Sequence, residues 1–178
     1  MSFFPPSAPM RSFPVITTAH PLSCGIAVRP GGVAAASTAW ATANQARYVP
    51  FLIPDPFLVR KLLAYNGATT GGNTDMGVYD ENGAEVVGIA AAAQSGTSAW
   101  QEFDVTDTWL VPGLYYVGLL NTTTTGTYYA YANKELGRMA GVFSQAVGAA
   151  TLPSPTATFA ALDTYGVPVV GMSSRVLI

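Results

Sequence analysis

The chain has 178 residues and a formal net charge of −2, and only 10% of its side chains are charged although 49% are hydrophobic. Nucleic acid is excluded as the main partner, because phosphate binding needs clustered Lys and Arg and the arginines are scattered from Arg11 to Arg175. No apolar run reaches the ~18 residues of a membrane helix, and the first residues lack the pattern of a secretory signal. Cys24 is the single cysteine, so no disulfide within the chain is expected.

Residues 1–44 are predicted to form an extended, proline-rich N-terminal arm. Prolines interrupt helices and disfavour helical geometry in the residue before them. The segment nevertheless carries large apolar side chains, in which disordered tails are usually depleted. We therefore expect the arm to dock on a neighbouring subunit, with these interface residues: Phe3, Phe4, Phe13, Val15 and Ile16.

Residues 45–133 are predicted to form the β-sandwich core. Stretches such as FLVRKLLAY, WQEFDV, GLYYVGLL and TYYAYAN are rich in β-branched and aromatic residues, and Gly, Asn and Thr turns separate them at the ~8–12-residue spacing of sandwiches or barrels. In WQEFDV, alternation places Phe103 and Val105 on one face and the acids on the other. The fold class is therefore all-β.

Residues 134–178 are predicted to contain a short helix or loop and then an extended C-terminal arm. Its final residues are apolar, so we expect them either to add a strand to a neighbour or to pack against the protein's own sheet. The interface residues expected here are Val176, Leu177 and Ile178.

The stretch NGATTGGNTDMGVYDENGAEVVG, residues 66–88, combines turn residues with acids. Aligning Asp80, Asn82 and Gly83 with a helix-loop-helix calcium loop leaves apolar residues at the first and last ligand positions. A hairpin tip at DENG fits better, because Asn and Gly tolerate positive φ. A structural cation held by Asp75 and loop carbonyls is the alternative.

Residues capable of catalysis do not form a known motif. Glu102 and Asp104 share a strand face at about 7 Å by strand rise, which any strand produces, so a solvated face is favoured over a glycosidase pair. His20 and Cys24 lie in the arm, which is a poor scaffold for positioning a base or a nucleophile. We expect no enzymatic activity, no cofactor and no metal site.

Tyrosines cluster on two predicted neighbouring strands. They are suited to a protein core or an interface, and with tryptophans they are also suited to stacking on sugar rings. Since consecutive residues point to opposite faces, one of each Tyr pair is expected in the core. The set comprises Tyr115, Tyr116, Tyr128, Tyr129 and Tyr131, with Trp100 and Trp109.

The segments ANQARYVPF, GGNTDMGVYDENG, QSGTS and DVTDTWLVPGLYYVGL, together with the Thr-rich loop, resemble a β-sandwich module of tailed-bacteriophage virion structural proteins. The likeness covers about half of the chain and includes no catalytic residue. It implies a single antiparallel, jelly-roll-like sandwich, here with extended N- and C-terminal arms.

The resemblance and the composition together predict a non-enzymatic virion component, made in the host cytoplasm. It would be a capsid decoration or accessory protein, or a neck or tail subunit. The expected partners are further copies of the chain, as a trimer or larger ring, and other virion proteins, with no membrane partner. The alternative is a carbohydrate-binding module used in host adsorption, with a glycan as its partner.

Overall fold

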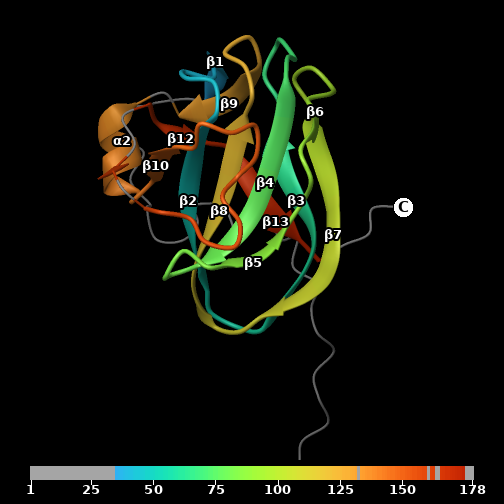
Figure 1. The fold of residues 1–178 in the computed structure, drawn as a ribbon, viewed down its shortest axis with the longest axis vertical. Coiled ribbons are helices and arrows are strands. Elements are labelled where there is room, and N and C mark those ends of the chain that lie inside the picture. Colours follow the sequence, from blue (N-terminus) through green and yellow to red (C-terminus); the bar gives the residue numbers. More distant parts are fainter. Residues whose placement is uncertain (1–34, 132, 160, 163–164, 175–178) are drawn as a thin grey trace, which may run out of the picture.

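The computed structural model describes residues 35–131, 133–159, 161–162 and 165–174 (Figure 1). Their elements, in chain order, are β1 (Ala36–Ala39), β2 (Gln45–Ile53), β3 (Phe57–Tyr65), β4 (Asn73–Asp80), β5 (Glu85–Gly88), β6 (Ala92–Ala93), β7 (Trp100–Leu110), β8 (Gly113–Asn121), β9 (Thr127–Tyr131), α2 (Lys134–Met139), β10 (Phe143–Ala146), β11 (Ala161–Leu162), β12 (Val167–Pro168) and β13 (Val170–Ser173). All the strand pairs of these elements are antiparallel, which confirms the predicted all-β class.

The chain from β2 to β8 is one long hairpin folded onto itself. β2 pairs with β8, β3 pairs with β7 inside that pair, and β4 pairs with β5 at the centre. β8 also pairs with β4, so that the strands lie in the order β2-β8-β4-β5 within one sheet. This nested connectivity is typical of a jelly roll, and the predicted jelly-roll-like sandwich is confirmed.

The main core lies between the large β11-β10-β2-β8-β4-β5 sheet and the two smaller sheets, β13-β3-β7 and β1-β9-β12 (Figure 1). Alternation along β2 shows how the sequence builds it, because Val49 and Phe51 are fully buried in this core while Tyr48 faces the other side of the sheet. Burying each such side chain contributes about 1.5–3 kcal/mol before entropy costs.

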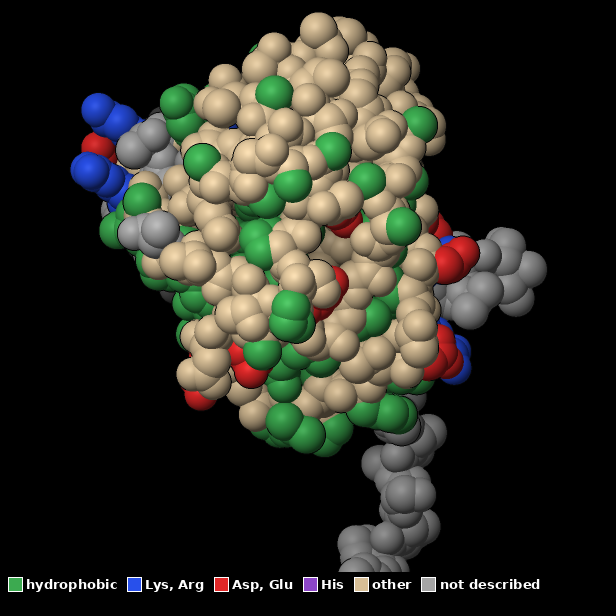
Figure 2. All heavy atoms as spheres, viewed as in Figure 1, with side chains coloured by type: hydrophobic (Ala, Val, Ile, Leu, Met, Phe, Trp, Pro, Cys, Tyr) green, Lys and Arg blue, Asp and Glu red, His purple; other side chains and the backbone are tan. Residues whose placement is uncertain are grey.

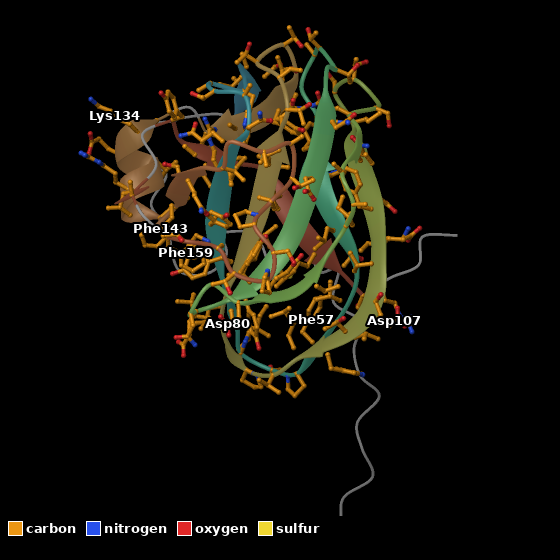
Figure 3. All side chains as sticks on the ribbon, viewed as in Figure 1. Phe57, Asp80, Asp107, Lys134, Phe143 and Phe159 are labelled. Atoms are coloured by element: carbon orange, nitrogen blue, oxygen red, sulfur yellow. The ribbon has the colours of Figure 1, made fainter. Side chains whose placement is uncertain are left out.

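The outer face of the large sheet is covered as well. Residues 147–159 cross it after β10, and Leu152 and Ala157 pack there against Tyr48, Tyr79 and Tyr116. Phe143 and Phe159 stack at the side of this layer with ring centroids 5.5 Å apart. Their labels lie next to each other in Figure 3. The protein therefore has three layers where β2, β8 and β4 lie.

The predicted N-terminal boundary and the predicted extended form of the C-terminal arm need correction. β1 pairs with β9 and Trp40 is buried in the main core, so residues 36–40 belong to the sandwich and the boundary at residue 44 was placed too late. The described part of residues 134–178 is not an extended arm, because β10, β12 and β13 pair with β2, β9 and β3. Each of these short strands becomes stable by completing a sheet that already exists.

Helix α2 begins after Asn133, whose side-chain oxygen accepts hydrogen bonds from the backbone N–H groups of Glu135 and Leu136. It ends before Gly141, which has a φ of +70°, a conformation that glycine adopts without strain. In the part of the chain that the structure describes, no helix has the length and apolarity to cross a membrane.

Candidate functional site

The acid-rich stretch of residues 66–88 contains a tight hairpin between β4 and β5. Asp80 accepts hydrogen bonds from the backbone N–H groups of Asn82 and Ala84, at 2.8 and 2.9 Å. Gly83 has a φ of +84° and its N–H donates to the Asp80 carbonyl. The predicted hairpin tip is confirmed, and the Asp80 carboxylate is occupied in closing the turn.

Asp75, the candidate cation ligand, is buried under the C-terminal segment. Its carboxylate accepts a 2.7 Å hydrogen bond from the backbone N–H of Leu152. Burial raises the pKa of Asp75, and the charge of Glu85 adds to this shift. The described residues contain no group of three or more His, Cys, Asp or Glu side chains placed to hold a metal ion. Asp75 thus fastens residues 147–159 to the large sheet.

Glu102 and Asp104 lie on the outer face of β7, as predicted, but they share a cation. The Lys61 ammonium of β3 lies 3.1 Å from Glu102 and 3.0 Å from Asp104. These charged hydrogen bonds raise the pKa of Lys61. The two carboxylates therefore converge on one ammonium group on a sheet surface, and they do not face each other across a substrate.

The other residues proposed from the sequence fall outside the described part of the chain. They are His20 and Cys24, and the predicted interface residues Phe3, Phe4, Phe13, Val15, Ile16, Val176, Leu177 and Ile178.

The tyrosines on β8 do not form a sugar-binding platform. Tyr115 is buried in the main core and Tyr116 is buried beneath residues 147–159, so both faces of this strand are covered. The prediction that one member of this pair lies in the core is confirmed by Tyr115. Tyr116, on the opposite face, is not available to a ligand because the C-terminal segment adds a third layer. Tyr128 is also in the main core.

The outer face of the smaller sheets carries a partly buried aromatic trio of Tyr65, Trp100 and Tyr129. The Tyr65 ring lies 5.0 Å from Trp100 and 4.8 Å from Tyr129, with interplanar angles of 70° in both contacts. The Tyr65 hydroxyl donates to the Ser98 carbonyl. Edge-to-face packing of this kind is favourable, and it tilts the flanking rings relative to the central one.

One end of the sandwich is uncharged and polar. We call the loops at residues 66–72, 94–99 and 121–127 the polar pole. Figure 2 shows few hydrophobic side chains (green) and no charged ones (blue or red) at the tip of this upper end. Buried amides join these loops, since Gln94 donates to Asn66 and Asn121 donates to the Gly71 carbonyl. This network fixes the loops from within. The network could not be predicted from the sequence, because Asn66 before Gly67 indicates an ordinary turn.

The opposite end of the sandwich is apolar. We define the apolar pole as the exposed side chains of the β2–β3 and β7–β8 connections and their flanking strand ends: Leu52, Pro54, Pro56, Trp109, Val111 and Pro112. The exposed fractions are 56% for Leu52, 57% for Trp109 and 67% for Val111. Figure 2 shows hydrophobic side chains along this lower end, where Figure 1 places both connections.

The apolar pole is held rigidly by the sandwich beneath it. The Tyr115 hydroxyl donates to the Val111 carbonyl at 3.0 Å, which fixes the β7–β8 turn. Ile53 and Leu110, next to the exposed residues in sequence, are buried in the main core. The signal for this surface was present in the stretches LIPDPF and WLVPG, where prolines form turns between apolar residues.

Comparisons of this chain with protein-family models, with curated proteins and with solved structures found no match.

Proposed function

We propose that the protein is a non-enzymatic structural component of a tailed-phage virion. It acts as a capsid decoration or accessory protein, or as a neck or tail subunit, and it assembles with further copies and with other virion proteins. The apolar pole is the observation that carries this proposal. A contiguous patch of exposed apolar side chains on a protein surface often marks a site of interaction with another protein.

Two further features support the proposal. The candidate catalytic and metal-binding acids are engaged in structural contacts, with Asp75 on a backbone N–H, Asp80 in the hairpin, and Glu102 and Asp104 on Lys61. The sequence segments that resemble phage virion modules correspond to β2, β4, β7 and β8 of the jelly-roll core. A rigid sandwich with an apolar end suits repeated docking in a symmetric particle.

The test is the mass of the purified protein in solution, measured by light scattering across a concentration series. The parent chain is expected to form a trimer or larger ring. Val111→Asp should shift it to the monomer, because a carboxylate would be buried without a partner at the contact. Thr124→Asp is the matched control, since it adds the same charge at an exposed position of the polar pole. A monomeric parent, or equal effects of the two variants, would contradict the proposal.

Carbohydrate binding is the second candidate function, and the partly buried aromatic trio is the observation that favours it. Trp100 and Tyr129 flank Tyr65 beside hydroxyl-rich loops, and exposed aromatic rings stack on the apolar faces of sugars. A glycan array separates the candidates. Saturable binding by the parent chain that is lost in Trp100→Ala would support the second function, whereas no binding at any glycan would remove it.

A further inference from the structure

Charge is divided unevenly between the first 34 residues and the rest of the chain. Residues 1–34 contain Arg11 and Arg29 and no acidic residue, whereas residues 35–178 contain six basic and ten acidic side chains, a formal charge of −4. The N-terminal segment is therefore cationic and the remainder is anionic. Segments of opposite charge attract each other and find their register through that attraction.

The apolar pole carries acids within and around it. Asp55 is exposed between Pro54 and Pro56 in the β2–β3 connection. Asp80 and Asp107 lie towards the same end, on opposite sides of the molecule (Figure 3); Asp107 is paired with Arg60 at 3.1 Å. Because Arg60 offsets the charge of Asp107, the negative charge within the pole itself is that of Asp55.

Residues 1–16 carry the complementary chemistry. Arg11 lies two residues before Phe13, and Val15 and Ile16 follow, so a cation sits beside a short apolar run. Phe3 and Phe4 form a second apolar pair in the same segment. An apolar surface that includes the acid Asp55 fits an apolar segment with a basic residue, and prolines reduce the entropy that such a segment loses on binding.

Chain length allows this segment to reach another molecule. At about 3.3 Å per extended residue, the 19 residues between Ile16 and Ala36 span up to about 60 Å, whereas the nine residues of β2 cover only about 30 Å. Residues 1–16 can therefore extend past the sandwich to which they belong.

We propose that the apolar pole of one copy binds residues 1–16 of a second copy, through Leu52, Trp109 and Val111 and the acid Asp55. This inference rests on the proposed function, since it assigns the partner of the same surface. It makes each subunit both a donor and an acceptor of an arm.

Disulfide trapping with full-length chains tests the inference. In a Cys24→Ser background, one chain carries Ser12→Cys and an affinity tag, and the other carries Val111→Cys. Mixed under mild oxidation, they are expected to give a linked tagged–untagged product at least about tenfold more than when the second chain carries Thr124→Cys. Thr124 is the matched control because it is exposed at the polar pole.

The outcomes separate the inference from the proposed function. Equal linkage at Val111 and Thr124, or none at either, overturns the inference. A single chain with both Ser12→Cys and Val111→Cys that forms only an internal disulfide also overturns it, because the arm would then bind its own sandwich. If the oligomer persists in solution without the Ser12–Val111 product, only this inference fails. If the parent chain is monomeric, the proposed function fails too.

Discussion

Replacing Gly83 tests the contact between the β4–β5 hairpin and the C-terminal segment. A Cβ atom at Gly83 would lie 2.5 Å from the carbonyl oxygen of Ala157, closer than the 3.0 Å below which real Cβ contacts are essentially never found. The same two residues share a hydrogen bond, from the Ala157 N–H to the Gly83 carbonyl, at 2.7 Å. Any side chain at this position must therefore move residues 147–159 away from the hairpin.

The expected loss for Gly83→Ala has two parts. A left-handed backbone costs a non-glycine residue about 1–2 kcal/mol, and weakening the hydrogen bond to Ala157 costs about 0.5–1.5 kcal/mol. The free energy of unfolding should fall by about 1.5–3.5 kcal/mol in total. At roughly 2–4 °C per kcal/mol for a protein of this size, the melting temperature should fall by about 3–14 °C.

Gly148 is the matched control, because its φ is +69° and a Cβ there would meet nothing within 4 Å. Gly148→Ala should show the backbone cost alone. Asn adopts the left-handed conformation with less strain, so Gly148→Asn should be nearly neutral while Gly83→Asn remains destabilised by the clash. Urea unfolding and thermal melting measure all four variants. Gly83→Asn with the stability of the parent would refute the reasoning.

Two more predictions concern buried polar groups. The pKa of Asp75 is raised in the folded protein, so proton uptake stabilises the fold as the pH falls from 7 towards the unfolded pKa of about 3.9. Over this range the melting temperature of the parent should rise relative to that of Asp75→Asn. A difference in melting temperature that stays constant with pH would contradict the burial argument. Tyr128→Phe should lower the free energy of unfolding by about 1–3 kcal/mol, because the Tyr128 hydroxyl forms hydrogen bonds with the buried Thr74 and Asn121. Urea unfolding should show a smaller loss of stability for the outward-facing control Tyr129→Phe. Equal losses for the two variants would refute this role of the network.

The strands from β2 to β9 were predictable because alternation is local. Tyr115, Val117 and Leu119 of β8 are each two residues apart on the core face, and turn residues separate the strands. The hairpin at Gly83 was predictable for the same reason, since Asp80, Asn82 and Gly83 contain the turn chemistry themselves.

The C-terminal strands and both poles were not predictable from local pattern. β13 has four residues, and it is a strand because it pairs with β3, with Val170 opposite Ala64. A proline-rich stretch such as residues 147–159 carries no periodicity that reveals which surface it covers. The exposure of Trp109 likewise depends on where the β2–β3 and β7–β8 connections meet, which only the fold determines.

The third layer has a consequence for biosynthesis. Tyr48, Tyr79 and Tyr116 are covered by residues 147–159, which leave the ribosome only after the jelly-roll strands are already outside. At about 5–20 residues per second, synthesis from the end of β8 at Asn121 to residue 159 takes about 2–8 s. During that interval one face of the large sheet exposes aromatic rings. A chain that stalls or is cleaved before Leu152 should therefore aggregate, whereas a completed chain covers this face with residues 147–159.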